Sequence, residues 1–356
     1  MVSLFALGAG ACGELPNQTT VQDLRVLGVK CEPGGFLVNL DDPGSATEAE
    51  LTATLTALVV DPNGGGQELA VMGVGCPDYI DTITSATLQG SKLCPPASVT
   101  SMIPEPIGSK LATVPATGSP TANPIVPYGI EYNPTLTFGL RPDQVAAFFS
   151  PIPTGIQLLD DSVALNRDFG LAAIVNLTFG LGNERVEAIK RVVYWPRLDP
   201  AQQPNKNPTM GGVRLYRHRD DATGNPIDEI DPVLEPTPTV SVGAMDKLYV
   251  QPAYGPEIAE SYLLRVRNAE TMQIETKVVD RELIRFYFYA SPVGTFDPEL
   301  QFSEENPITM VFHDDSEYVL PPADKIPADG KVTIWIVAHD ERAGTDWVSR
   351  TINLVP

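Results

Sequence analysis

Alternation of apolar and polar side chains is the feature that most limits what this chain can fold into. In ELTATLTALVV, the residues Leu51, Ala53, Leu55, Ala57 and Val59 fall on one face, and threonines occupy much of the other. A period of two residues is that of a β-strand with one buried face. The turn signal DPNGGG follows directly. This stretch therefore predicts a half-buried strand that ends at a tight turn.

Strand patterns of this kind recur in both halves of the chain. GLAAIVNLTF and ERVEAIKRVVYW flank the turn GLGN and predict a long hairpin. DLRVLGVK places Leu24, Val26 and Gly28 on one side. In KVTIWIVAHD, one face carries Trp335 and Val337, and the other carries Val332, Ile334, Ile336 and Ala338. Short strands joined by Gly, Pro and Asp turns, with almost no helical period, predict β-sandwiches.

Two stretches without alternation divide the chain. Residues 95–130 are rich in Pro, Ser and Thr, and they predict a long loop within an insertion at about 77–165. One short helix is expected at PDQVAAFF. The polar segment DPAQQPNKNPT, at 199–209, is predicted to be a linker. The chain is therefore expected to contain a first sandwich over 22–198 and a second over 210–356.

The charge of the chain excludes some classes of partner. Among 356 residues, 45 are acidic and 24 are Lys or Arg, which gives a formal net charge of −21. Such a chain repels phosphate backbones, so nucleic acid is not an expected partner. It also repels anionic membrane surfaces, and no apolar run reaches the roughly 18 residues of a spanning helix. Membrane attachment would therefore need a lipid or another protein.

The opening stretch LFALGAGAC is a candidate for such a lipid attachment. Apolar residues at 4–7 and small residues at 8–11 precede Cys12, and this order looks like the lipobox of bacterial lipoproteins. There the cysteine is acylated and becomes the new N-terminus. We expect a signal remnant over 1–12 and a polar tether over 13–21, with Cys12 as the lipid attachment site. The alternative is an unstructured terminus with a chance cysteine.

The other cysteines have different expected roles. Cys76 and Cys94 lie in the Pro-flanked stretches GCPDYI and KLCPP, which are typical of loops, and they are predicted to form a disulfide. That bond would close a loop of about 18 residues, which stabilises by about 3 kcal/mol. Cys31 falls on a strand pattern and is predicted to be a buried free thiol. With three histidines and no CxxC spacing, no zinc site is expected.

Three clusters of ionisable residues are candidate sites. Asp220, Asp221 and Asp228 gather carboxylates in DDATGNPIDEID, but calcium needs six to eight oxygen ligands and the spacing fits no EF-hand. A solvated acidic loop is the alternative. FHDDSE at 312–317 offers acid-base or metal-binding groups, with a surface turn as the alternative reading.

The third cluster, which contains His339, Asp340 and Arg342, lies at the end of the strand pattern KVTIWIVAHD. His339 and Asp340 lack the GxSxG elbow of a catalytic serine. Asp340 and Arg342 are expected to hold the terminal turn through hydrogen bonds and a surface ion pair, which adds little stability.

Aromatic residues cluster in IRFYFYAS. Phe286 and Phe288 fall on one face, and Tyr287 and Tyr289 on the other. Exposed tyrosines on a flat sheet can stack on a sugar or anchor a partner protein, so Tyr287 and Tyr289 are a candidate binding surface. Core and edge packing is the alternative explanation.

Several stretches together resemble a known group of proteins. DLRVLGVKCEP with LTATLTALVVDPNG, ERVEAIKRVVYW with PNKNPT, and ASPVGTFDPELQF with VTIWIVAHDERAGTDW resemble predicted surface lipoproteins of myxobacteria and their relatives. Those proteins are built from tandem immunoglobulin-like domains. The resemblance implies an all-β fold with two immunoglobulin-like β-sandwich domains, the first with a long loop insertion. It implies an address and an architecture, but no reaction.

The expected function is therefore a non-enzymatic one. We expect a lipid-anchored protein of the outer membrane or cell surface, facing the periplasm or the exterior, without a cofactor. It would act as a binding, adhesion or structural subunit, with protein partners or self-assembly. The alternative is a carbohydrate-binding accessory protein or a hydrolase whose site lies in the insertion, where Glu105 and Glu131 are the available acids.

Overall fold

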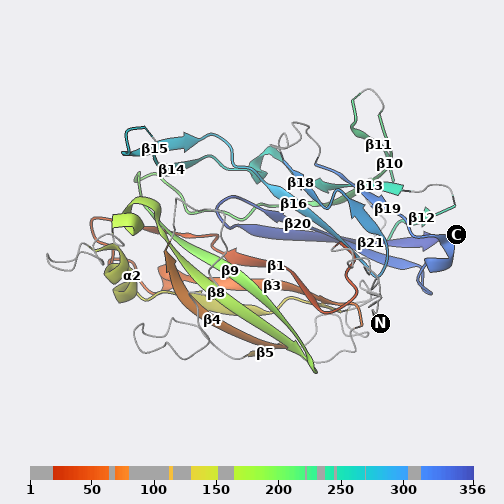
Figure 1. The fold of residues 1–356 in the computed structure, drawn as a ribbon, viewed down its shortest axis with the longest axis horizontal. Coiled ribbons are helices and arrows are strands. Elements are labelled where there is room, and N and C mark those ends of the chain that lie inside the picture. The colour runs from red at the N-terminus through yellow and green to blue at the C-terminus, as the bar shows by residue number, and fades with distance from the viewer. Residues whose placement is uncertain are drawn as a thin grey trace, which may run out of the picture.

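The structure is a computed structural model that describes residues 19–63, 69–79, 112–114, 130–150, 164–220, 223–230, 237–243, 247–268, 270–303 and 314–356. Strands dominate these ranges and form stacked sheets (Figure 1). The expected all-β sandwich fold class is therefore confirmed. None of the helices in the described ranges is long and apolar enough to cross a membrane.

Two sheets are built from the part of the chain before residue 199. Sheet 1 contains, in spatial order, β2 (Phe36–Val38), β9 (Glu184–Pro196), β8 (Leu171–Leu181), β4 (Leu69–Tyr79) and β5 (Ala112–Val114). Sheet 2 contains β1 (Arg25–Glu32), β3 (Thr52–Asp61), β6 (Ile130–Tyr132) and β7 (Thr135–Gly139). The predicted long hairpin is formed by β8 and β9, which pair along the whole of β8 and along β9 up to Tyr194.

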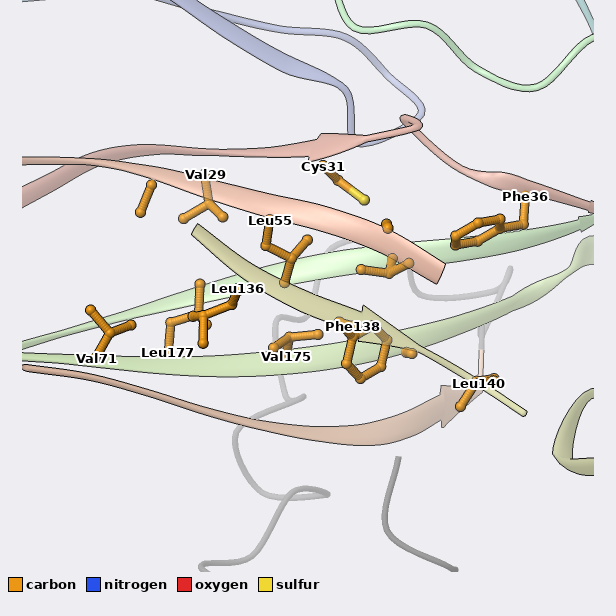
Figure 2. Packing of buried hydrophobic residues seen from close by; sticks show 14 of the residues in the cluster. Val29, Cys31, Phe36, Leu55, Val71, Leu136, Phe138, Leu140, Val175 and Leu177 are labelled. Carbon is orange, nitrogen blue, oxygen red and sulfur yellow. The ribbon is translucent and has the colours of Figure 1, made fainter. Parts of the chain in front are cut away.

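Alternate residues of these strands meet between sheets 1 and 2 as the first core. β3 contributes Leu55 and Val59 from sheet 2, and β8 contributes Val175 and Leu177 from sheet 1. Figure 2 shows Leu55, Val175 and Leu177 in the same layer. Burying one such side chain stabilises the fold by about 1.5–3 kcal/mol. Cys31 lies in this core as a free, buried thiol, as predicted.

Two further sheets are built from the chain after residue 209. Sheet 3 contains β12 (Thr239–Ser241), β21 (Thr345–Val355), β20 (Lys331–His339), β16 (Arg285–Ser291) and β18 (Leu300–Phe302). Sheet 4 contains β11 (Pro226–Glu229), β10 (Gly212–Arg219), β13 (Lys247–Ala253), β19 (Ser316–Val319) and β17 (Thr295–Asp297). Phe286, Phe288, Ile334 and Ile336 of sheet 3 pack against Leu248 and other residues of sheet 4 as the second core.

The remaining elements are short. The helix predicted at PDQVAAFF is α2 (Pro142–Phe149), and the Gln144 side chain accepts a hydrogen bond from the Arg141 N–H at 2.9 Å at its start. The hairpin of β14 (Tyr262–Arg267) and β15 (Ile274–Val279) forms a separate two-stranded sheet. Single 3₁₀ turns are η1 (Ala49–Leu51), η2 (Pro256–Ile258) and η3 (Ala323–Lys325).

Sheets 2 and 3 pack face to face, so the four sheets form one stack. Leu58 and Val60 of β3 meet Trp335 and Val337 of β20 in a third apolar cluster. All four side chains are fully buried. The end of β3, ALVV, and most of β20 are apolar on both faces, which fits their position between two covering layers, as in the inner strands of other buried sheets.

The N-terminal segment of the described chain also joins the two halves. Before entering β1, residues 19–21 run parallel to the end of β16. The Val21 N–H donates to the Ala290 carbonyl at 2.8 Å, and the Ala290 N–H donates to the Thr19 carbonyl at 2.9 Å. Thr19 and Val21 are buried. Part of the expected tether, 13–21, therefore belongs to the folded body.

The strand register differs from the predicted one in β1. A bulge lies between Val26 and Gly28, so Leu27 is an extra residue. Val26 packs on the first core, whereas Leu27 packs in the cluster between sheets 2 and 3. A Cβ on Gly28 would lie 3.1 Å from Val337 Cγ1. Gly28 thus faces sheet 3 and not the side shared by Leu24 and Val26.

Parts of the expected insertion at about 77–165 are components of the sandwich. β5 pairs with β4, and both β6 and β7 pair with β3. Val145 of α2 is buried in the first core. β6 and β7 thus complete the hydrogen bonding along one edge of β3. The boundaries of the two expected domains stay a prediction.

Candidate functional site: a buried polar seam and an edge-strand groove

A cluster of buried polar side chains lies where the turn between β20 and β21 meets the 199–209 segment. We call this cluster the polar seam. It consists of Lys190, Asn205, Asn207, Glu260, Glu282, His339, Asp340, Arg342 and Thr345. Lys190 lies on β9, His339 on β20 and Thr345 on β21, whereas the other groups lie in connecting segments, and both halves of the chain contribute.

Asp340 holds the turn, as the sequence predicts. Its Oδ1 accepts hydrogen bonds from the N–H groups of Arg342 at 2.8 Å and Gly344 at 2.6 Å. Its Oδ2 accepts from Asn205 Nδ2 at 2.9 Å. Burial raises the pKa of the Asp340 carboxyl, and these hydrogen bonds oppose that rise.

The ion pair of Arg342 is buried and not on the surface, which corrects the expectation. Its Nε lies 3.0 Å from Glu282 Oε2, and a terminal nitrogen lies 2.8 Å from Glu260 Oε2. The guanidinium also stacks over the Tyr262 ring at 4.5 Å. Arg342 is 8% exposed and Glu282 is 1% exposed. The start of β14 and the segment before β16 cover the pair, which sequence spacing did not reveal.

Lys190 reaches across from the first half of the chain. Its Nζ donates to the Ala343 carbonyl at 2.6 Å and to Thr345 Oγ1 at 3.0 Å. Burial lowers the pKa of Lys190 to about 8. His339 Nδ1 lies 3.1 Å from the same hydroxyl, and burial, assisted by the positive charge of Lys190, lowers the pKa of His339 to about 4. His339 is therefore neutral at pH 7.

Asn207 ties the 199–209 segment to both halves. Its Nδ2 donates to the Cys31 carbonyl at 2.7 Å and to Glu32 Oε2 at 2.9 Å, and its Oδ1 accepts from the Thr345 N–H at 2.9 Å. The segment expected to be a linker is thus a structural component of the seam. The seam groups hydrogen-bond with one another, which is the arrangement of a structural network.

Besides a hollow of about 20 Å³ lined by Asn205, Tyr262 and Arg342, two further hollows lie near the seam in the described part of the chain. The larger, which we call the β2 groove, has a volume of about 380 Å³ and is lined by β2, by residues of 43–51 and by Val145. A smaller one of about 120 Å³ lies between Trp195 and the β14 residues Leu263 and Leu264. Both border the first sandwich at an edge of sheet 1.

The acidic loop does not gather its carboxylates in the described part of the chain. Asp220 Oδ1 accepts from the Thr223 N–H at 2.8 Å and so closes a turn. Asp228 lies 3.8 Å from the Arg217 guanidinium. Asp221 lies outside the described residues. Within the residues that are described, no group of three or more His, Cys, Asp or Glu side chains could hold a metal ion.

The acids of FHDDSE have separate partners. Asp314 accepts from Gln251 Nε2 at 2.8 Å and Tyr254 Oη at 2.6 Å. Asp315 pairs with Arg219, and Glu317 pairs with Lys247 at 2.8 Å. Asp314 and Asp315 are buried beside β19, so the expectation of a surface turn is wrong for them. His313 lies outside the described residues.

Tyr287 and Tyr289 face the first half of the chain. Both are partly buried against the cluster between sheets 2 and 3. Burial raises the pKa of Tyr289 to about 12. Their face is thus used for packing within the chain, which is the alternative that the sequence left open.

The predicted cysteine chemistry stays a prediction. Cys12 and Cys94 lie outside the described residues, as does Glu105. Cys76 is a backbone partner of Ile174 within β4 and does not lie in a loop. The strand continues through Pro77, whose missing N–H is tolerated at a strand edge.

The seam and the stacking of sheets 2 and 3 were missed by sequence reasoning. A signal was available for the stacking, since ALVV in β3 and IWIVA in β20 are apolar on both faces. For the seam, the asparagines of PNKNPT were the available signal, because Asn in a short segment between sheets often bonds to neighbouring backbone.

Comparisons with known proteins give no family. No family model and no curated protein matches the chain. Solved structures that match weakly include the periplasmic chaperone SfaE, at 9% identity and a TM-score of 0.22, over 92% of this chain and 99% of that one. A bacterial adhesin from Mobiluncus mulieris also has 9% identity and a TM-score of 0.22, over 94% of this chain and all of that one. A structure of a 1.5-MDa bacterial ice-binding adhesin matches at 9% identity and a TM-score of 0.18, over 94% of this chain and 65% of that one.

Proposed function

We propose that this chain is a non-enzymatic, lipid-anchored protein of the outer membrane or cell surface, and that it serves as a binding or structural subunit of a larger assembly. One observation carries the proposal: four sheets stack through three apolar layers into one body. A rigid body of this kind holds loops and edge strands in fixed positions, which suits binding to other molecules.

The anchor in this proposal is an acylated Cys12. Thr19 is seven residue steps along the chain from Cys12, and a chain of that length spans at most about 25 Å. Since Thr19 is buried beside β16, an acyl group on Cys12 would keep the folded body close to the membrane. The net charge of −21 repels anionic lipids, so the acyl chains would supply the attachment.

The mass of the protein in membranes tests this proposal. The gene is expressed with its natural upstream region in a bacterial host, and the detergent-extracted protein is weighed intact. We expect a chain that begins at Cys12 and carries acyl chains. Cys31→Ser, the matched control, keeps this mass and the membrane location, whereas Cys12→Ser loses both. An unmodified Cys12 in protein that fractionates away from membranes would contradict the proposal.

A further inference from the structure

We propose that the β2 groove binds an extended peptide segment that carries a carboxylate, by adding a strand to the free edge of sheet 1. This inference rests on the binding role proposed above and names a site and a partner class for it.

No strand among the described residues pairs with the outer edge of β2, so its backbone offers a free edge within that part of the chain. β2 is the terminal strand of sheet 1 and pairs in parallel with β9. The Val38 carbonyl accepts from the Arg197 N–H at 2.9 Å, so the backbone groups of Val38 face β9. In a parallel ladder the intervening residue points the other way, which directs the N–H and C=O of Leu37 to the free edge. Such an edge is a template for another strand.

The groove follows this edge for the length of a short peptide. Its lining includes the whole of β2 and both flanking residues, Gly35 and Asn39. Ala46, Leu51 and Val145 supply apolar lining from other elements. Its volume of about 380 Å³ falls within the roughly 300–1,000 Å³ range of ligand sites. A strand in the groove would thus find backbone partners on one side and apolar contacts on the other.

The groove lining contains one acid, Glu50, and one base, Arg197. The Glu50 carboxylate already accepts from the N–H and the hydroxyl of Thr47, both at 2.8 Å. The Ser45 hydroxyl donates to the Asp42 carbonyl at 2.7 Å. The Arg197 side chain is exposed and makes no hydrogen bond or ion pair with the part of the chain that is described. Arg197 is therefore the cation of the lining that has no acid partner among the described residues, and a peptide carboxylate placed at its end of the groove, away from Glu50, would pair with it.

A peptide titration followed by NMR tests the inference. The probe is acetyl-Thr-Val-Thr-Val-Glu with a free C-terminus, added to the full chain. We expect shift changes at 35–39 and slower exchange of the Leu37 N–H. Arg197→Gln should weaken binding about two- to fivefold, the size of an exposed ion pair. Arg185→Gln, the same change at the opposite end of β9, should leave binding unchanged.

Two modified peptides separate strand addition from charge attraction. An analogue with Gln and a C-terminal amide in place of both carboxylates should bind equally to the parent protein and to Arg197→Gln. An analogue N-methylated along its backbone should not bind. Absence of shifts at 35–39 at millimolar peptide, or unchanged binding after N-methylation, would overturn the inference. Since the titration uses protein in solution, its failure leaves the Cys12 mass measurement unaffected, and the reverse also holds.

Discussion

Arg342 carries the positive charge for two acids of the seam. Replacing it with Met keeps much of its volume but leaves the buried Glu282 without its cation, whereas Glu260 keeps Lys206 at 3.6 Å. Breaking a buried ion pair in this way costs about 3–5 kcal/mol, so we expect Arg342→Met to lower the free energy of unfolding by that amount. Urea unfolding measures it. Arg185→Met, at an exposed position, should stay within about 0.5 kcal/mol of the parent, and a similarly small loss for Arg342→Met would contradict the buried pair.

His339 gives the seam a predictable response to acid. Burial lowers the pKa of His339 from its ordinary value of 6.5 to about 4 in the folded protein. Between these values the unfolded chain binds a proton that the folded chain does not, so the stability contribution of neutral His339 is lost as the pH falls from 6.5 to 4. Over that window the loss reaches about 3 kcal/mol.

The comparison with His339→Asn isolates this effect from the carboxyl groups. Asp340 and Glu282 have raised pKa values, which shift stability in the opposite direction on acidification, and both remain in the variant. We expect the parent to lose more stability than His339→Asn between pH 6.5 and 4 in urea unfolding. Parallel pH profiles for the two proteins would show that His339 is not held neutral.

At the scale of elements, the contact of sheet 2 with sheet 3 depends on one glycine. A Cβ on Gly28 would meet Val337 at 3.1 Å and Thr345 at 3.5 Å. Gly28→Val should therefore separate the sheets and destabilise the fold by about 1–3 kcal/mol, the usual cost of overpacking. Gly180→Val is the control, because a Cβ there meets nothing closer than 3.9 Å. Thermal or urea unfolding compares them, and equal effects of the two substitutions would be inconsistent with close packing at Gly28.

Elements that depend on a pattern of neighbouring residues could be predicted from the sequence. Alternation identified β3, β20 and the β8–β9 hairpin, and a proline with an aspartate identified α2. The bulge at Leu27 was not predictable, because it depends on how β1 registers against β3. The seam joins residues far apart in the chain, such as Lys190 and Thr345, so no local pattern encodes it. The sequence also did not reveal that Tyr287 and Tyr289 are partly buried, because the residues that pack against them lie in the other half of the chain.

At the scale of the whole molecule, the two halves are joined at three levels. Apolar side chains join sheets 2 and 3, the polar seam joins the 199–209 segment to both halves, and residues 19–21 run beside β16. Trp335 Nε1 also donates to Glu131 Oε2 at 3.2 Å across the same contact. Independent motion of the halves would have to expose all of these groups together, so they should move as one body.

Residual dipolar couplings test this central claim most directly. Backbone N–H couplings are measured for the full chain in a weakly aligned solution, and alignment tensors are fitted separately to residues 25–196 and 212–355. A single body predicts two tensors with the same magnitude and orientation in the frame of the structure. Tensors of clearly different magnitude would show that the halves reorient independently, and they would contradict the four-layer stack.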